Sequence, residues 1–464
     1  MDRRSFTKVL ATGCLLPFVN IRFGGAGYAQ TASPSTTVHA VTRVIEINGK
    51  AATVFGLIGP DGKPGLSLDA KVVTSVDLIN ALPAETMIHW HGMTPPWPQD
   101  GVPGMPGPML RAGETRRYAM PGGLPGTHWM HAHTLQEQAL LAAPLIVRGA
   151  EDQARDAQDV VILLHDFSWK SPEELLAGLQ AGGAMGGMDM SSTNAAMVPD
   201  LNDIQYDAYL ANDRTLDDPE VVTVDKGGMV RVRIINGATA TGFTIYVGGL
   251  QTQVIAVDGQ DIAPLDATTF PLSMGQRVDF LCRIPADGGA FPILARREGA
   301  GERAGIVLAT KGAAVVKLPV AGALNGPVLT LDSEARLITA RPLIAAPVTR
   351  QFALELTGTM QGYKWGIAIP DPIKVALGDR VEMTFRNTTM MAHPMHMHGH
   401  HFQVVAINGT AFSGALRDTV LVPPMTSVSV AFDANNTGEG WALHCHHLYH
   451  MATGMMTTVA YGGA

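Results

Sequence analysis

Short apolar runs, separated by turns rich in glycine and proline, recur along the whole chain. Clear examples are residues 160–164, 230–235, 404–407 and 428–432. Runs of this length between turn residues are typical of β-strands. Helical patterns are short, and residues 172–179 form the best of them. The pattern therefore predicts an all-β protein with many short strands.

One strand-like pattern occurs three times. Each copy ends in asparagine, and the twelfth residue after that asparagine is glycine. The runs are residues 71–80, 229–236 and 380–387, and the glycines are Gly92, Gly248 and Gly399. The ninth and eleventh residues after the asparagine are histidines in the outer copies and apolar residues in the middle copy. We predict one β unit repeated three times, with metal-binding residues only in the first and third copies.

The domain organisation follows from this repeat. A chain of 464 residues accommodates three domains at the usual ~150 residues each. A charged stretch at residues 149–159 interrupts the apolar runs, and a later segment rich in Ala, Pro and Gly is typical of a linker. The predicted divisions are domain 1 at residues 30–155, domain 2 at 156–315, a linker at 316–345 and domain 3 at 346–464.

The N-terminus has the pattern of an export signal. Arg3 and Arg4 precede an apolar run at residues 9–19, and small residues at 27–29 offer a cleavage site. This arrangement resembles a twin-arginine signal, with an ordinary secretory signal as the alternative. The run is too short for stable membrane insertion. We expect residues 1–29 to direct export through the twin-arginine machinery to the periplasm.

Composition narrows the function. The chain carries 33 basic and 41 acidic residues, a formal charge of −8, and no long basic run, which argues against nucleic-acid binding. Its hydrophobic content of 46% against 16% charged residues excludes a disordered protein. Sixteen histidines against three cysteines is the unusual feature, because it favours metal chemistry over a disulfide framework.

Eight of the histidines form four His-x-His pairs. The pairs are His89/His91, His131/His133, His396/His398 and His444/His446. Residues i and i+2 of a strand share a face, so each pair presents two imidazoles side by side. Eight imidazoles exceed the ligands of a single ion. We therefore predict a cluster of several metal ions between the first and last domains.

The motif at residues 444–446 is His-Cys-His, and its central side chain points to the opposite face of the strand. The sulfur of Cys445 should therefore bind a different ion from its neighbours. His393 precedes the third pair, and His450 and Met455 follow the cysteine closely. Two imidazoles, a thiolate and a weak axial thioether are the ligands of blue-copper electron-transfer sites.

With these residues in place, the chain resembles the multicopper oxidases, which include laccases, bacterial cuprous oxidases and ascorbate oxidase. The similarity lies in the motifs His-Trp-His-Gly at 89–92, His-Trp-Met-His-Ala-His at 128–133, His-Pro-Met-His-Met-His-Gly at 393–399 and His-Cys-His at 444–446. The resemblance implies three tandem cupredoxin-like Greek-key β-sandwich domains and four copper ions. It also implies electron transfer from a donor at a type 1 copper to O2 at a trinuclear cluster.

The resemblance also implies the ligands. The type 1 copper would be bound by His393, Cys445, His450 and Met455, and the type 2 copper by His89 and His396. The type 3 pair would be bound by His91, His131, His133, His398, His444 and His446. Four histidines beside the motifs, His128, His400, His401 and His447, match no ligand position and are expected behind the ligands or at the surface.

Reduction of O2 to water also requires protons. Asp100, eleven residues after His89, matches the acidic residue that the family places near the cluster, although Asp-Gly is equally typical of a plain turn. Tyr449 departs from the family pattern, because many bacterial members carry glutamate there. A proton route through residue 449 is not expected in this chain.

The donor could be a phenolic compound or Cu(I). A Met-rich loop at residues 181–198 offers thioethers, which suit Cu(I) and a role in copper tolerance, but the same methionines could simply lie in a flexible loop. Oxidation of Mn(II) or Fe(II) and a non-catalytic cupredoxin scaffold are alternatives. A zinc hydrolase is disfavoured by the thiolate between two imidazoles. A copper nitrite reductase is disfavoured by the four His-x-His pairs.

Overall fold

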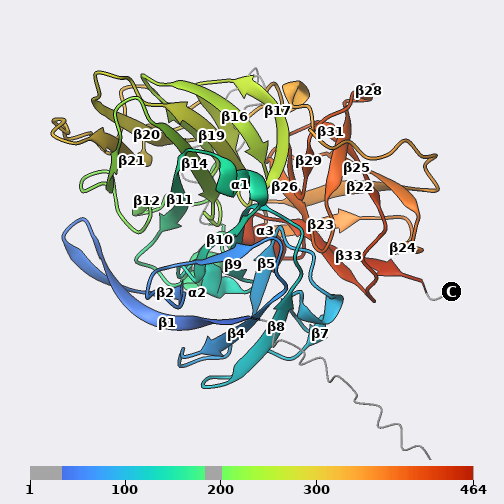
Figure 1. Ribbon diagram of the computed structural model, residues 1–464. Helices are drawn as coiled ribbons and strands as arrows, with labels where there is room; N and C mark the ends of the chain where they lie inside the picture. The colour runs from blue at the N-terminus through green and yellow to red at the C-terminus, as the bar shows by residue number, and fades with distance from the viewer. Residues whose placement is uncertain (1–33, 183–200, 463–464) are drawn as a thin grey trace, which may run out of the picture. The chain divides into compact units, whose positions relative to one another are not determined.

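The computed structural model describes residues 34–182 and 201–462. Within them the chain forms three pairs of β-sheets, one after another along the sequence (Figure 1). The prediction of an all-β protein with three cupredoxin-like sandwiches is confirmed. The signal sequence at 1–29 and most of the Met-rich loop at 181–198 lie outside the described residues.

The first sandwich contains β1 (Ser35–Ile47), β2 (Lys50–Ile58), β3 (Leu66–Asp69), β4 (Thr74–Asn80), β5 (Ile88–His91), β8 (Thr115–Met120), β9 (Gly126–Ala132) and β10 (Ala142–Arg148), with the small ribbon β6 (Val102–Pro103) and β7 (Pro106–Gly107) beside it. The middle sandwich contains β11 (Gln158–Phe167), β12 (Ala208–Ala211), β13 (Val221–Val224), β14 (Met229–Asn236), β15 (Phe243–Val247), β16 (Gln251–Val257), β17 (Gln260–Asp266), β18 (Thr269–Leu272), β19 (Arg277–Arg283), β20 (Ala290–Arg297) and β21 (Arg303–Thr310). The last sandwich contains β22 (Arg350–Thr359), β23 (Lys364–Ala368), β24 (Ile373–Val375), β25 (Arg380–Asn387), β26 (His393–Met397), β27 (Phe402–Ile407), β28 (Thr410–Ala411), β29 (Leu416–Arg417), β30 (Thr419–Val422), β31 (Ser427–Asp433), β32 (Trp441–Cys445) and β33 (Met456–Tyr461).

Helices are short in the described part of the chain. They are α1 (Ala150–Ala154), α2 (Pro172–Gln180) and α3 (Leu448–Ala452), with 3-10 turns η1 (Trp97–Gln99), η2 (Leu135–Glu137) and η3 (Glu334–Arg336). Helix α2 is the predicted one, and it begins at a capping box in which Ser171 and Glu174 satisfy each other's backbone N–H groups. None of the helices in these residues is long and apolar enough to cross a membrane.

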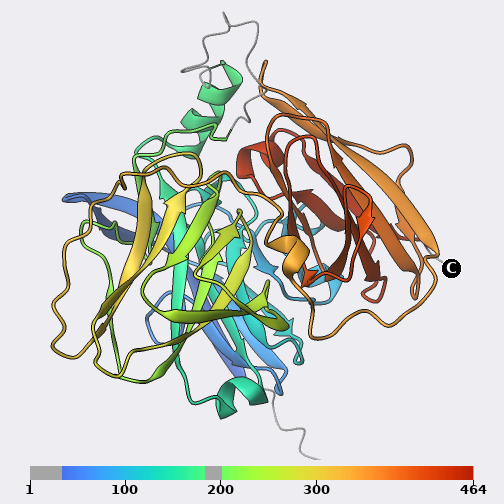
Figure 2. The same cartoon turned by 90° about the horizontal axis from the view of Figure 1, so that it is seen from above.

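The three sandwiches share one strand arrangement. In each, an early strand pairs in parallel with the asparagine-terminated strand, as β1 with β4, β11 with β14 and β22 with β25. On the other sheet of each sandwich, β3 pairs in parallel with β10, β13 with β21 and β24 with β33. Figure 2 shows the layered strands of the middle sandwich, from green to yellow, and of the last one, from orange to red. The threefold repeat in the sequence is thus a repeat in topology.

The repeated asparagine ends its strand in the same way each time. Asn80, Asn236 and Asn387 are buried, and each side-chain oxygen accepts the backbone N–H two residues later. Each side-chain NH2 group donates to two backbone carbonyls of neighbouring segments: Ala84 and Leu110, Thr241 and Leu272, Met391 and Val422. Asparagine supplies both a donor and an acceptor, which this turn needs. The turn directs the chain toward the strand that follows, where the outer repeats carry histidines.

The sandwiches pack into one another through apolar side chains. The cores of the middle and last sandwiches form one continuous cluster of buried residues, and the first sandwich has its own. Two smaller clusters join the first sandwich to the middle one: one includes Leu140 and Phe167, and the other includes Trp129 and Ile235. These contacts hold β5 and β9 beside β26 and β32, where the histidine motifs lie.

Candidate metal centre

Eight imidazoles gather where strands of the first and last sandwiches meet. They belong to the four predicted pairs, and their exposed fractions lie between 0 and 5%. Strands β5, β9, β26 and β32 each carry one pair, within the strand or at its end. Three subsets bring one nitrogen of each ring within 4.8 Å of the others: His89/His91/His396, His91/His131/His446 and His133/His398/His444.

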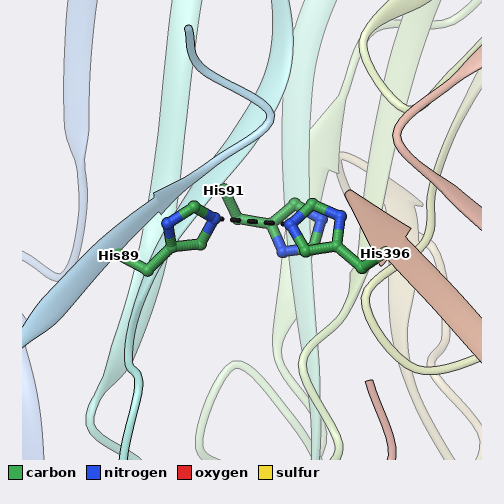
Figure 3. A group of neighbouring side chains, drawn as sticks. All are labelled: His89, His91 and His396. Carbon is green, nitrogen blue, oxygen red and sulfur yellow. Dashed lines mark hydrogen bonds between the residues drawn. The ribbon is translucent and has the colours of Figure 1, made fainter. Parts of the chain in front are cut away.

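The first subset joins β5 to β26 (Figure 3). The Nε2 atoms of His89 and His396 lie 3.4 Å apart, and the two rings approach from opposite sides. The ring of His91 stacks on that of His396 with centroids 3.8 Å apart. The Nδ1 atoms of His89 and His396 contact backbone carbonyls, those of Asp100 and Asp418, each at 2.9 Å.

These contacts assign the ring tautomers. A carbonyl only accepts, so Nδ1 of both His89 and His396 carries the proton. Both Nε2 atoms then present lone pairs to each other at 3.4 Å, and no hydrogen bond can form between them. Two facing lone pairs in a buried site repel each other unless a cation lies between or beside them. The arrangement therefore fits a bound metal ion.

The subset of His133, His398 and His444 repeats this geometry. Nε2 of His444 lies 3.0 Å from Nε2 of His398 and 3.3 Å from Nε2 of His133. Nδ1 of His398 donates to the Asp100 carboxylate at 2.8 Å, and Nδ1 of His444 donates to the Cys445 carbonyl at 2.9 Å. The Nε2 atoms of His398 and His444 therefore again present lone pairs to each other.

The third subset contains orphaned nitrogens. Among the described residues, Nδ1 of His91, Nε2 of His131 and both nitrogens of His446 lack hydrogen-bond partners although they are buried. Nδ1 of His131 donates to the Glu137 carboxylate at 3.0 Å. Buried polar atoms are nearly always hydrogen-bonded, so several orphans in one place indicate a missing partner. A metal ion supplies that partner for imidazole nitrogens.

Cys445 faces away from these subsets, as its position in the strand predicts. Its Sγ lies 3.8 Å from Nδ1 of His393 and 3.7 Å from Nδ1 of His450, and the two Nδ1 atoms are 3.2 Å apart. Nε2 of His393 bonds to the hydroxyl of Thr389 at 2.8 Å, and Nε2 of His450 bonds to the carboxylate of Asp203 at 3.2 Å. Three donors thus converge: two imidazole nitrogens and a sulfur.

Met455 lies beside this second site. Its side chain is fully buried, and its carbonyl accepts the Cys445 backbone N–H at 3.1 Å. Met395 and Met397, which alternate around His396, are buried in the apolar core. The middle and last sandwiches contain one buried free cysteine each, Cys282 and Cys445, and only the latter is near histidines.

Burial sets the protonation of the site. It lowers the pKa of seven of the eight clustered histidines, and the positive charge of neighbouring imidazolium groups lowers it further for most of them. For His444 the pKa falls to about 4. These seven rings are therefore neutral at pH 7, as metal ligands must be. Burial raises the pKa of the Cys445 thiol, so the thiolate forms when a cation replaces the proton.

Asp100 lies within the cluster. It ends the 3-10 turn η1, its side chain is buried, and its Oδ2 accepts from His398 while its Oδ1 lies 3.3 Å from Nδ1 of His89. Gly101 after it has φ +90°, and an added Cβ would lie 1.9 Å from the Ile88 carbonyl. Asp100 therefore both precedes the tight Asp-Gly turn and contacts two of the clustered histidines.

The four histidines beside the motifs lie behind the ligand candidates rather than at the surface. His447 stacks on His450 with centroids 3.8 Å apart, and Nε2 of His401 lies 3.8 Å from the Asp418 carboxylate. His400 bonds to the hydroxyl of Tyr461 at 2.7 Å, and His128 contacts the Leu124 carbonyl at 3.1 Å. The hydroxyl of Tyr449 donates to Gln138 at 3.1 Å.

Sequence reasoning did not identify the carboxylates that hold the outer nitrogens. Asp203, Asp418 and Glu137 are buried, and each accepts from a predicted ligand histidine: His450, His91 and His131. One signal was available for Asp418, since the pair Arg417-Asp418 interrupts an apolar run. No local pattern marks Asp203, because its partner is 247 residues away in the chain. Glu137 follows its partner His131 by only six residues, and this spacing was a local signal that sequence reasoning missed.

Comparison with known proteins gives consistent matches. Three protein-family models, each described as multicopper oxidase, match residues 39–152, 158–317 and 346–463. The chain is 33% identical over 410 residues to multicopper oxidase MmcO of Mycobacterium tuberculosis, covering 83% of this chain and 79% of that protein. It is 24% identical to copper resistance protein A of Escherichia coli, covering 86% and 88% of the two chains.

Solved structures show the same fold. The structure of Fet3p, described as a multicopper oxidase that functions in iron import, superposes with a TM-score of 0.76 at 15% identity, over 92% of this chain and 90% of that one. A multi-copper oxidase from Pseudomonas thermotolerans superposes with a TM-score of 0.68 at 21% identity, over 92% and 99%.

Proposed function

The chain belongs to the multicopper oxidase family, and from this premise we propose that it binds four copper ions and couples one-electron oxidation of a donor to reduction of O2 to water. Membership makes it a copper-dependent oxidoreductase that uses oxygen. The count of four ions and the assignment of each ligand belong to the proposal.

The proposed ligand sets are those that the resemblance to the family implies, and the convergence of donor atoms supports them. His393, Cys445, His450 and Met455 would hold a type 1 copper. His89 and His396 would hold a type 2 copper, and His91, His131, His133, His398, His444 and His446 the type 3 pair. The observation that carries the proposal is the set of facing lone pairs, since two neutral imidazole Nε2 atoms 3.0–3.4 Å apart cannot hydrogen-bond to each other and a metal cation removes their repulsion.

Copper bound at these positions supplies one-electron redox chemistry, and four such ions match the four electrons that O2 requires. The chain itself supplies the path between the sites, because Cys445 is bonded through the backbone to His444 and His446, which face the other group. The thiolate and the two imidazoles thus connect donor oxidation to the cluster.

Asp100 is the residue that we propose for proton supply to the cluster. Its Oδ2 fixes the Nδ1–H of His398, and its Oδ1 lies near Nδ1 of His89. It therefore orients two ligands and keeps a carboxylate beside the reacting group. Tyr449 holds Gln138 rather than facing this group, which supports the expectation that residue 449 is not part of the route.

Phenolic compounds and Cu(I) are the donors that we propose, with a role in copper tolerance. Support comes from relatives whose names are copper resistance protein A and laccase. Oxidation of Mn(II) or Fe(II) is less favoured, because Fet3p, described as functioning in iron import, shares only 15% identity with this chain and supports the fold alone. A non-catalytic scaffold is less favoured because all twelve predicted ligand residues are present and buried or nearly so.

We further propose export through the twin-arginine machinery, removal of residues 1–29 and a periplasmic location. Support comes from Arg3, Arg4 and the short apolar run that follows them. The domain divisions at residues 155/156 and 316–345 remain part of the proposal.

A steady-state comparison of donors tests the function. Copper-loaded protein should consume O2 with 2,6-dimethoxyphenol and with Cu(I), and faster than with Mn(II) or Fe(II). Oxidation of Mn(II) or Fe(II) alone would replace the proposed donor class. Loaded protein that consumes no O2 with any of the four would contradict an enzymatic role.

A further inference from the structure

One turn of the middle sandwich touches the metal centre, although this sandwich supplies none of the proposed ligands. The turn spans residues 275–277, at the start of β19. Gly275 has φ +79°, and a Cβ added there would lie 2.6 Å from Cδ2 of His446. The side chain of Gln276 donates to the carbonyl of Thr419 at 3.1 Å. The backbone of the turn therefore lies directly against the histidine cluster.

Arg277, the third residue of the turn, is fully buried. Its Nη1 and Nη2 donate to the two oxygens of Asp418 at 2.6 and 2.5 Å, which is a bidentate pair. Its Nε donates to the carbonyl of Thr127 at 3.1 Å, and Nη1 also donates to the carbonyl of Gly275 at 3.1 Å. A planar guanidinium with these partners leaves the carboxylate of Asp418 one orientation.

Asp418 in turn touches two of the clustered histidines. Its Oδ1 accepts from Nε2 of His91 at 3.0 Å, and its carbonyl accepts from Nδ1 of His396 at 2.9 Å. With Nε2 protonated and bound, Nδ1 of His91 carries the lone pair, and this atom is one of the buried orphans in the described structure. A partner on the outer nitrogen fixes the tautomer and the ring orientation of a metal ligand.

We infer that Arg277 and Asp418 form a positioning pair, by which the middle sandwich fixes His91 with Nδ1 toward the metal centre. Arg277 locks the carboxylate, and the carboxylate locks the ring. The inference rests on the proposed function, because it assigns His91 a copper to face. It gives the sandwich without ligands a defined part in the metal centre.

A structural ion pair would look similar, so the test compares two buried arginines of the middle sandwich. Arg233 is also fully buried, and it donates to Asp159, Asp279 and Thr127 rather than to Asp418. Arg277→Met and Arg233→Met therefore remove the same kind of group from similar surroundings. Only the first removes a group that acts on a ligand.

The experiment loads each full-length variant with copper and measures three quantities. They are copper affinity by competition with a chelator, the EPR and near-ultraviolet signals of the cluster, and the blue absorption of the thiolate site. Arg277→Met and Asp418→Asn should each lower the copper affinity of the cluster by about 10- to 100-fold and leave the blue band intact. Arg233→Met should keep wild-type affinity even where it lowers the melting temperature.

Combination of the two changes adds a further test. The double variant Arg277→Met/Asp418→Asn should lose little more affinity than either single variant, because the two residues act as one unit. Wild-type affinity in Arg277→Met, or an equal loss in Arg233→Met, would overturn the inference. If Arg277→Met does not fold, Arg277→Lys and Asp418→Asn decide, and wild-type affinity in both overturns it. A wild-type protein that binds no copper would overturn the proposed function and the inference with it.

Discussion

Replacing Asp203 with asparagine tests how the protein sets the reduction potential of the proposed type 1 site. Oδ2 of Asp203 accepts from Nε2 of His450 at 3.2 Å, and it also contacts Nε2 of His447 and the hydroxyl of Tyr363. Burial raises the pKa of this carboxyl, but hydrogen bonds from His447 and His450 lower it more, so the net pKa lies below the usual value. Asp203 is therefore ionised at neutral pH.

The negative charge stabilises the oxidised site more than the reduced one, because the ligand ring is more positive when copper is Cu(II). A hydrogen bond to a charged group contributes about 1.5–3 kcal/mol and a neutral one about 0.5–1.5 kcal/mol, so the substitution removes about 1–1.5 kcal/mol. At 59 mV and 1.36 kcal/mol per factor of ten, the potential should rise by about 40–65 mV. Both ends of this range assume that the whole loss falls on the oxidised state.

The assay is a redox titration of the blue absorption in the wild type and in Asp203→Asn. Asp166→Asn is the matched control, since Asp166 is a buried carboxylate of the middle sandwich that binds Thr239 and Thr241 instead of a ligand histidine. The control should leave the potential unchanged. An unchanged or lower potential in Asp203→Asn would refute the electrostatic reasoning.

Three further predictions follow from the same sites. Cys445→Ser should abolish both the blue absorption and the oxidase activity. The control Cys282→Ser changes the buried free cysteine of the middle sandwich and should keep both. Blue absorption and activity in Cys445→Ser would contradict the type 1 assignment. Copper-free protein should lose stability as pH falls from about 6.5 toward about 4, by about 1.4 kcal/mol per pH unit for each buried histidine. The reason is that the pKa is lowered in the folded state, so the unfolded chain binds more protons than the folded chain in this pH range. Melting temperatures independent of pH in that window would contradict the prediction. Deletion of residues 182–196 should impair Cu(I) oxidation more than phenol oxidation in steady-state assays, and equal losses would argue against Cu(I) binding by that loop.

The sequence predicts the architecture well because the signals are local. In each sandwich the asparagine ends one strand and the glycine twelve residues later comes after the next strand. The structure shows why asparagine is needed at its turn. The residues of the candidate site could also be predicted from the sequence, since His-x-His in a strand presents both rings on one face. The alternation at residues 444–446 correctly separates the sulfur of Cys445 from its neighbours.

The groups that orient the histidines could not be predicted in this way. Arg277, Asp418 and His91 come from three different sandwiches, and only the folded chain brings them within hydrogen-bonding distance. Asp203 precedes its partner His450 by 247 residues. A single charged residue in a strand or turn carries no mark of its distant partner, whereas a ligand motif carries its chemistry within a few residues.

The ratio of donor oxidised to O2 consumed tests the central claim most directly. With a one-electron donor in excess, copper-loaded protein should oxidise four donor molecules for each O2 and release no hydrogen peroxide, because the cluster delivers four electrons before product leaves. A ratio of two donor molecules for each O2, with hydrogen peroxide accumulating, would contradict a trinuclear cluster fed by the thiolate site.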